Sequence, residues 1–287
     1  MNEYRIFTDS GCDISAETLR KWDVSCVDLS FSFEGEDKIY VNADMPLADF
    51  YARMRAGEQP RTAAVNIQNF ADAFEPALAA GQDVLYIGIS SGISTTFNSA
   101  RIAASELLEK YPERSIRVVD TMAASAGVGM IAYVAAEKKK AGLSLAENAD
   151  ALDALTAHNC VWFTVDDLEY LKRGGRVSPT VAFVGGLLGV KPVLHMGDDG
   201  TLTKVTTARG RKKSLEVLAD KFTEFGGEAA GPIFISHAES ESDAQLLAGM
   251  LRERGAQDIT LISEIGPIIG SHAGPGTIAL FFLGAHR

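Results

Sequence analysis

The residues best suited to chemistry in this chain lie close together, in a loop that carries five hydroxyl side chains: Ser90, Ser91, Ser94, Thr95 and Thr96. The loop follows an apolar run at 84–89 and precedes a segment with Phe97, Ile102 and Leu108 on its apolar side, an order that predicts strand, loop and helix. In parallel α/β sheets, ligands bind outside the carboxyl ends of the strands, and a helix N-terminus there offers free N–H groups. The loop therefore suits an anion such as a carboxylate or phosphate. Simple capping of the helix by Ser94 or Thr95 is the alternative.

Three other polar residues stand at comparable places. Asp9 and Ser10 follow a predicted strand at 4–8, so they lie at the carboxyl end of that strand, where ordinary turn chemistry is the alternative role. Thr62 lies in a predicted loop at 57–63, just before a predicted helix at 65–80. Thr62 is either the cap of that helix or a second anion-binding hydroxyl.

His272 lies in a Gly/Pro-rich stretch, 266–276, that we expect to form a turn. Its glycine neighbours allow close approach of another group, and histidine titrates near neutrality and donates to carboxylates or phosphates. Arg173 and Arg176 flank two glycines and either clamp an anion together or lie at the surface.

A different reading comes from residues 88–92, which have the letters G-x-S-x-G of a hydrolase nucleophile elbow. A serine hydrolase acting through Ser90, with the late His272 as its base, is therefore the alternative function. Five hydroxyls compete for that role, and no oxyanion loop is evident. The five histidines are scattered (His158, His195, His237, His272 and His286), so no metal site is predicted.

Composition limits the classes of function. The 287 residues are 46% hydrophobic and 23% charged, typical of a globular protein, and a net charge of −11 argues against a nucleic-acid partner. The three cysteines are far apart, which favours a reducing compartment. The N-terminus does not resemble a signal peptide, and no apolar run approaches the ~20 residues that span a bilayer. We expect a cytoplasmic protein.

The two halves of the chain differ in pattern. Up to about residue 141, strands and helices alternate, which predicts an α/β domain with a mostly parallel, Rossmann-like sheet over residues 1–157. Residues 24–33 are predicted to form one strand, with 37–41 as its return arm. The later hairpin signal at 197–200 favours an α+β domain with a mixed sheet over residues 158–287. The apolar stretch 181–190 is expected to be a buried helix or a wall segment.

Several motifs together resemble the DegV family, in order and over residues 5 to about 283. They are residues 8–10, Thr62 after Pro60, 89–100, 119–121, 170–176, 191–192 and 265–276. The resemblance implies a two-domain protein that binds one long-chain fatty acid between its domains. It also implies a carrier with no catalytic residue of its own, which presents the fatty acid to a fatty acid kinase for acyl-phosphate formation in phospholipid synthesis.

The resemblance also implies roles for individual residues. Thr62 and Ser94 would hold the carboxylate, and Arg173 and Arg209 would line the entrance where kinase and phosphate arrive. The vicinity of the head group would hold His272, Asp9, Ser10 and Thr95. No cofactor and no metal are implied beyond the bound fatty acid, and a transient contact with a membrane is compatible with this role.

One departure from the family pattern concerns residues 62–66. The family usually has Thr-Ser-Gln-Pro-Ser, whereas this chain has Thr-Ala-Ala-Val-Asn. Thr62, the implied carboxylate contact, is kept, while a neighbouring hydroxyl and a proline are replaced, so the secondary contacts of the head group and the shape of this loop are left open.

The physical reading agrees with a lipid ligand. Burial of an acyl chain contributes ~0.8 kcal/mol per CH₂ before ordering costs, so tight binding needs no catalytic residue. A sugar-phosphate enzyme of related architecture would require polar walls, where this chain offers Phe183, Leu187 and Leu188. Chain length, saturation, oligomeric state and the identity of the kinase are left open.

Overall fold

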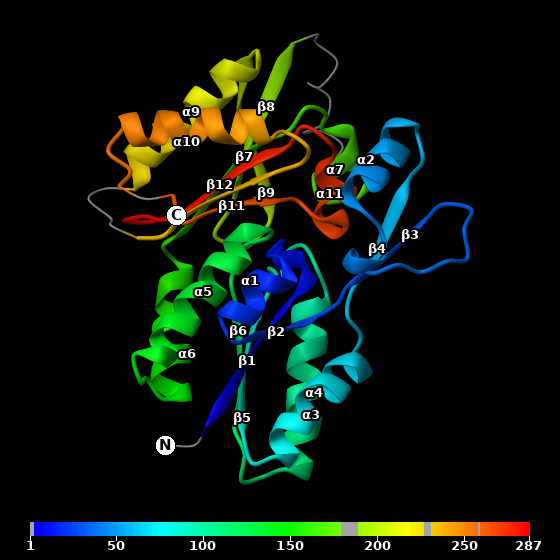
Figure 1. Cartoon of the computed structure of the whole chain (residues 1–287), viewed down its shortest axis with the longest axis vertical. Coiled ribbons are helices and arrows are strands. Elements are labelled where there is room, and N and C mark those ends of the chain that lie inside the picture. Colours follow the sequence, from blue (N-terminus) through cyan, green and yellow to red (C-terminus); the bar gives the residue numbers. More distant parts are fainter. Residues whose placement is uncertain (1–2, 179–188, 227–230, 258) are drawn as a thin grey trace.

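The computed structural model describes residues 3–178, 189–226, 231–257 and 259–287, and Figure 1 shows two sheets stacked end to end. The first is a four-stranded sheet in the order β2-β1-β5-β6, with all neighbours parallel. Its strands are β1 (Tyr4–Asp9), β2 (Val24–Val27), β5 (Asp83–Gly88) and β6 (Ile116–Asp120). Every residue of the central strand β5 is buried, as expected for a parallel strand covered on both faces.

Helices cover both faces of this parallel sheet. In Figure 1, α3 (Ile67–Ala79) and α4 (Thr96–Lys110) lie on one side, and α5 (Ala126–Lys140) and α6 (Leu145–Thr156) lie on the other. The short helix α1 (Ala16–Lys21) begins where predicted, because the Ser15 side chain accepts a hydrogen bond from the Thr18 N–H. A capping box of Ser144 and Glu147 starts α6 in the same way.

The second sheet is mixed and has six strands in the order β11-β10-β12-β7-β8-β9. They are β7 (Asn159–Thr164), β8 (Val190–Met196), β9 (Leu202–Arg209), β10 (Ile233–His237), β11 (Leu261–Glu264) and β12 (Ile278–Leu283). The predicted hairpin is β8 paired antiparallel with β9. Helices α9 (Arg211–Phe225) and α10 (Glu241–Glu253) lie on the outer face of this sheet (Figure 1).

These two sheets confirm the predicted fold class, a parallel α/β half followed by a mixed-sheet half. The chain passes from one sheet to the other between the end of α6 at Thr156 and the start of β7 at Asn159. A domain boundary between residues 157 and 158 stays a prediction. Among the described residues, no helix has the length and apolarity needed to cross a membrane.

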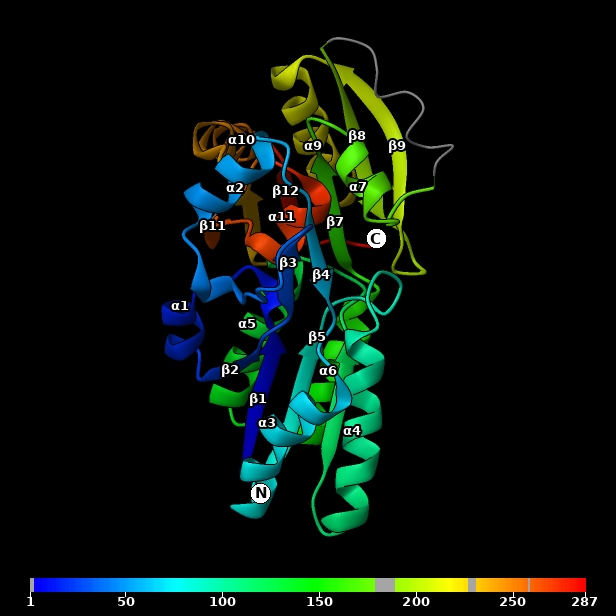
Figure 2. The same ribbon diagram turned by 90° about the vertical axis from the view of Figure 1, so that its right-hand side faces the viewer.

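A small third layer lies beside the junction of the two sheets, where the sequence-based expectation was wrong. Residues 24–33 form two strands instead of one. The first, β2, belongs to the parallel sheet, and the second, β3 (Ser30–Phe33), pairs antiparallel with β4 (Pro60–Ala63). Strand β4 lies where a loop was expected. Residues 37–41 contribute only one bridge, between Phe31 and Tyr40. The chain between β3 and β4 forms the 3₁₀ helix η2 (Asn42–Asp44) and α2 (Leu47–Arg55), seen beside β3 and β4 in Figure 2.

Two other local expectations are corrected, and a third falls almost entirely outside the described residues. The buried face of α4 consists of Thr96, Ala100, Ala103, Ala104 and Leu107, while Phe97, Ile102 and Leu108 are only half-buried. Small alanines let the helix approach the sheet closely. A prediction based on the large apolar side chains therefore identified the wrong face of the helix as the buried one. The Gly/Pro-rich stretch contains a helix, α11 (Pro267–Ala273), with Pro267 in its first turn. The stretch 181–190 lies outside the described residues except for its last two positions.

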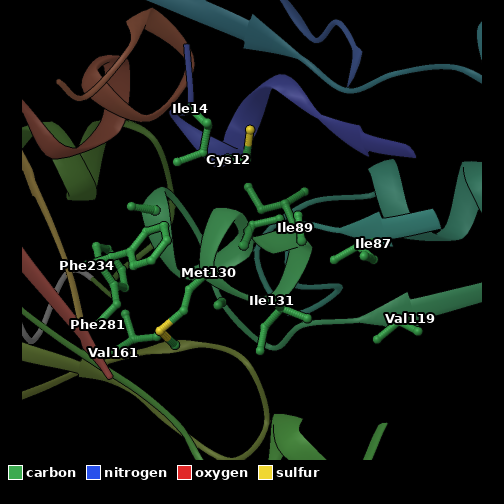
Figure 3. Close-up of a cluster of buried hydrophobic side chains, with 14 of the residues drawn as sticks. Cys12, Ile14, Ile87, Ile89, Val119, Met130, Ile131, Val161, Phe234 and Phe281 are labelled. Atoms are coloured by element: carbon green, nitrogen blue, oxygen red, sulfur yellow. The ribbon is translucent and has the colours of Figure 1, made fainter. Parts of the chain in front are cut away.

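The hydrophobic core joins the two sheets into one packed unit. Figure 3 shows Ile87 and Ile89 from the parallel half, Met130 and Ile131 from α5, and Val161, Phe234 and Phe281 from the mixed sheet. All of these side chains are buried. Helix α5 contacts β1 and β5 of the parallel sheet as well as β7, β10 and β12 of the mixed sheet, so it connects the two sheets.

Candidate functional site

A cavity of about 460 Å³ lies where the two sheets meet, at the carboxyl end of β5. Its wall toward the mixed sheet is apolar and comes from four strands: Val161, Phe163, Met196, Leu202, Ala279 and Phe281. The helix α11 adds Ile268 and Ile269, and the parallel half adds Leu29, Ile89 and Ala124. The volume falls within the range of roughly 300–1,000 Å³ that is usual for small-ligand sites.

One end of the cavity is polar. Thr62 from β4, Ser94 from the β5–α4 loop and His272 from α11 all line it, and we call these three residues the head-group cluster. The Thr62 Oγ1 and His272 Nε2 atoms lie 2.8 Å apart. Residues 210 positions apart in the chain thus form one hydrogen-bonded pair.

Ser94 is fixed by its neighbours in the loop. Its hydroxyl donates to the Thr96 Oγ1 over 2.9 Å and accepts from the Thr96 N–H over 3.2 Å. The Thr96 Oγ1 also accepts from the Val65 N–H over 3.3 Å. The N–H of Val65 therefore links the segment after β4 to the start of α4, a bond that a proline at that position could not donate.

The imidazole of His272 is held in an uncharged state. Burial, reinforced by the positive charge of Arg176, lowers the pKa of His272 to about 4. The ring is also packed tightly against the backbone, because a Cβ placed on Gly174 would lie 2.1 Å from the His272 Nδ1. The glycine that allows close approach to this histidine is thus Gly174, far away in sequence, rather than the glycines that flank it.

The polar end of the cavity is also its open end. Four lining residues are exposed to solvent, and all lie in the segments that carry Thr62 and Ser94: Ala64, Ser91, Gly92 and Thr95. The apolar wall of the cavity is largely buried by contrast. A ligand with one polar end would therefore have that end near solvent and its apolar part between the sheets.

Comparison with known proteins agrees with this architecture. A family model described as an uncharacterised protein of the DegV family matches residues 3–285. The chain belongs to the DegV family. It is 41% identical to a DegV domain-containing protein of Clostridium perfringens over 289 aligned positions, which cover 99% of this chain and 98% of that protein.

Two solved DegV-type structures show the same fold over nearly the whole chain. One is a DegV family protein from Thermus thermophilus for which fatty acid binding is described. It superimposes with a TM-score of 0.87 at 32% identity, and the match covers 99% of this chain and 100% of the other. The fatty acid kinase B3 protein of Streptococcus pneumoniae, loaded with linoleic acid, gives a TM-score of 0.87 at 24% identity, covering 98% and 99%.

Of the positions that the family resemblance suggested, four line the cavity of this DegV chain: Thr62, Ser94, Thr95 and His272. Thr62 lies on a strand and does not cap a helix, because Asn66 caps α3 by accepting from the Asn69 N–H. Thr95 stands at the N-cap position of α4, but its side chain makes no capping hydrogen bond.

Asp9 and Ser10, expected near the head group, do not line the cavity. The Asp9 carboxylate is fully buried and accepts hydrogen bonds from the Tyr86 hydroxyl and from the N–H groups of Ile89 and Gly11. Ser10 accepts from the Leu29 N–H. Both side chains order the loops behind the cavity, and the geometry gives no support to a contact with the head group.

The arginines do not form a joint clamp. Arg176 lines the cavity, where its Nε donates to the Ile93 carbonyl over 3.1 Å. Arg173 is exposed and lies over the Tyr170 ring, 4.7 Å from its centre. Arg209 is exposed on β9 and is not part of the cavity wall.

Ser90, the nucleophile of the alternative reading, has a structural role in this geometry. It is fully buried, and its hydroxyl donates to the Gly200 carbonyl over 2.8 Å. This bond ties the loop of the parallel half to the β8–β9 turn. Within the described part of the chain, no histidine is hydrogen-bonded to Ser90, and no group of three or more potential metal ligands is present.

Two polar wall residues were not anticipated from the sequence. Thr277 donates within its own turn, to the carbonyls of Ala273 or Gly274. Ser125, just before α5, contacts Asp13 Oδ2 over 2.6 Å and Ser236 Oγ over 2.9 Å, and we call these three residues the bridge cluster. Burial raises the pKa of Asp13 to about 8. No sequence pattern marks Ser125, because its partners come from β10 and from the turn after β1.

Proposed function

We propose that this chain is a carrier that binds one long-chain fatty acid in the cavity, with the carboxylate held by Thr62 and Ser94. The observation that carries the proposal is the shape of the site: one polar, open end with two hydroxyls and a histidine, and otherwise a largely apolar wall between two sheets. The Thermus thermophilus relative, described by fatty acid binding, supports the same ligand class.

The hydrogen bonds of the head-group cluster can accommodate a carboxylate without breaking the contact between Thr62 and His272. Because His272 is neutral, its Nε2–H can donate to Thr62, which frees the Thr62 hydroxyl proton for the ligand. The Ser94 hydroxyl can turn from Thr96 to the carboxylate, since the Thr96 Oγ1 still accepts from the Val65 N–H. A buried carboxylate requires such donors to stay charged.

The apolar wall supplies the affinity. At ~0.8 kcal/mol per buried CH₂, a chain of about sixteen carbons gains on the order of 10 kcal/mol before the cost of ordering it. Phe163, Phe281 and Met196 line the part of the cavity where the chain would lie.

We propose further that the bound fatty acid is presented to a fatty acid kinase, which phosphorylates its carboxylate. The open polar end would leave the head group accessible to a second protein. Arg173 is proposed as a contact residue, because it is the last residue of α7 (Glu169–Arg173) and directly precedes Gly174, which packs against His272. Arg209 is proposed for the same contact from the family resemblance.

Native mass spectrometry of the purified protein, followed by denaturing extraction, tests the ligand. We expect a co-purified mass of a C14–C18 fatty acid at near 1:1. The double variant Thr62→Val/Ser94→Ala should bind a fluorescent fatty acid at least tenfold more weakly, since two hydrogen bonds to a charged group are lost. A clean apo mass together with no uptake of added fatty acid would refute the proposal.

A reconstituted phosphorylation assay with a bacterial fatty acid kinase tests the partner. Arg173→Ala and Arg209→Ala should reduce kcat/KM for acyl-phosphate formation while fatty acid affinity stays unchanged. Lys140→Ala, an exposed change on α5, is the matched control and should behave as wild type. Unchanged kinetics in both arginine variants would refute their role.

A further inference from the structure

The cavity has a second polar point away from its open end. Ser125 lines the cavity and is only 4% exposed. The helix α11 gives the place of Ser125 along the cavity. Asp13, the partner of Ser125, accepts a hydrogen bond from the Gly266 N–H at the start of α11, and His272 lies near the end of α11. Six residues at 1.5 Å of rise put Gly266 and His272 about 9 Å apart along the helix, and we take this as the spacing of the two polar points.

The mixed sheet places the same point beside the apolar wall. Ser236, the other partner of Ser125, is directly opposite Ala279 in the pairing of β10 with β12. Ala279 lines the cavity and is paired on its other side with Phe163, also a lining residue. Ser125 therefore lies at the edge of the wall against which an acyl chain would pack.

The conformation of Ser125 shows that a side chain is kept there at a cost. Its φ of 54° and ψ of −146° lie in a region that is essentially reserved for glycine. Although Ser125 is the N-cap residue of α5, its side chain makes no capping hydrogen bond. Glycine would relieve the strain, so the hydroxyl itself accounts for the presence of serine.

The hydrogen-bonding capacity of this hydroxyl is not exhausted. A serine oxygen has one proton and two acceptor positions. Asp13 Oδ2 and Ser236 Oγ take up two of these three positions: when the protonated Asp13 donates to Ser125, the Ser125 proton goes to Ser236, and when Asp13 is ionised, Ser125 donates to Asp13 and accepts from Ser236. One acceptor position remains for a donor from the cavity.

We propose that Ser125 forms a subsite for a mid-chain hydroxyl group, so that the cavity accepts hydroxylated long-chain fatty acids as well as unsubstituted ones. This inference rests on the proposed fatty acid site. An extended chain advances about 1.3 Å per carbon for C–C bonds near 1.5 Å. The 9 Å spacing then corresponds to about seven carbons from the head group, and the hydroxyl belongs near carbons 8–10.

Binding of octadecanoic, 10-hydroxyoctadecanoic and 18-hydroxyoctadecanoic acids to the delipidated protein tests the subsite, by displacement of a fluorescent fatty acid. An unpaired hydroxyl buried in an apolar site weakens binding roughly five- to hundredfold. In the wild type, we expect the 10-hydroxy acid to bind within about threefold of octadecanoic acid. The 18-hydroxy acid should bind at least about tenfold more weakly.

Ser125→Gly removes the hydroxyl and suits the backbone, and it should weaken binding of the 10-hydroxy acid about tenfold or more relative to octadecanoic acid measured on the same variant. Ser91→Ala, a hydroxyl removed at the open end, is the matched control and should keep the wild-type ratio. Equal penalties for both hydroxy acids in the wild type would overturn the subsite even if no variant can be purified. An unchanged ratio in Ser125→Gly would do so too.

The outcomes separate this inference from the proposed function. If octadecanoic acid binds and the 10-hydroxy acid is rejected, only the subsite is wrong. If none of the three acids binds, the fatty acid site and the subsite fail together.

Discussion

The head-group cluster and the bridge cluster both join the two halves of the molecule, yet they are built differently. In the bridge cluster, Asp13 and Ser236 are buried and bonded to Ser125 or to backbone. In the head-group cluster, Thr62 and Ser94 are half-buried. Ser94 donates to the Thr96 hydroxyl, which also accepts from the Val65 N–H. The comparison indicates that the bridge cluster mainly holds the halves together and has one acceptor position left for a ligand, whereas the hydroxyls of the head-group cluster can both turn to a ligand.

The largest expected effect comes from removal of the bridge. Asp13→Ala leaves the Gly266 N–H and the Ser125 hydroxyl without their acceptor, and we expect the free energy of unfolding to fall by about 3 kcal/mol. Thr62→Val is the matched change in the head-group cluster and should cost less than about 1 kcal/mol. Urea denaturation of both delipidated variants measures this. Equal losses would remove the distinction between the clusters.

The next effect concerns the head-group cluster alone. In Gly174→Ala, the new methyl group would overlap the His272 ring, so the ring and its bond to Thr62 must shift. We expect fatty acid affinity to fall about tenfold and stability by about 1–2 kcal/mol. Gly249→Ala in α10 is the control, because its Cβ meets nothing within 4 Å, and it should be neutral or slightly stabilising. Unchanged affinity in Gly174→Ala would contradict the role of His272.

The pH dependence of stability should sharpen the comparison. Because the pKa of Asp13 is raised to about 8 in the folded state, the folded protein retains a proton that the unfolded chain loses near pH 4. Its contribution to stability is therefore present below about pH 4 and is lost as pH rises to about 8. His272, whose pKa is lowered to about 4, contributes oppositely: stability is lost as pH falls from 6.5 towards 4.

Asp13→Asn mimics the protonated carboxyl and should flatten the fall in stability between pH 4 and 8. Thermal unfolding at pH 5 and pH 8 measures the difference. The stability of the variant relative to the wild type should be higher at pH 8 than at pH 5. Asp9 lies nearby and also has a raised pKa, but it is present in both proteins and cancels in the comparison. An identical slope in both proteins would show that Asp13 does not carry the buried proton.

The smallest effect is expected at Ser90, which belongs to neither cluster. Ser90→Ala loses the bonds to the Gly200 carbonyl and from the Gly92 N–H, and stability should fall by about 1 kcal/mol with fatty acid affinity unchanged. A fluorophosphonate probe should not label the wild-type protein at Ser90, since this hydroxyl is buried and bonded to a carbonyl. Labelling there would restore the hydrolase reading.

The sequence by itself determined the local elements and the order of the two halves. The continuous apolar run of β5, the serine caps of α1 and α6 and the hairpin of β8 and β9 depend on neighbouring residues, so short-range patterns predicted them. The hydroxyl-rich loop was also visible as a candidate binding element. The sequence also indicates Thr62 as a candidate binding residue. It predicts a loop before a helix at this position, whereas Thr62 lies on the strand β4.

Only the tertiary structure decided which of these residues meet. Thr62 and His272 form a pair across 210 positions, and Ser125 reaches Ser236 across 111, distances over which no sequence periodicity carries information. Asp9 and Ser94 both come after a strand of the parallel sheet. Because β1 and β5 are neighbours in that sheet, the Asp9 carboxylate reaches the Ile89 N–H and is used there instead of lining the cavity. Burial and hydrogen-bond partners, which depend on packing of the two sheets, separate binding residues from structural ones with the same local pattern.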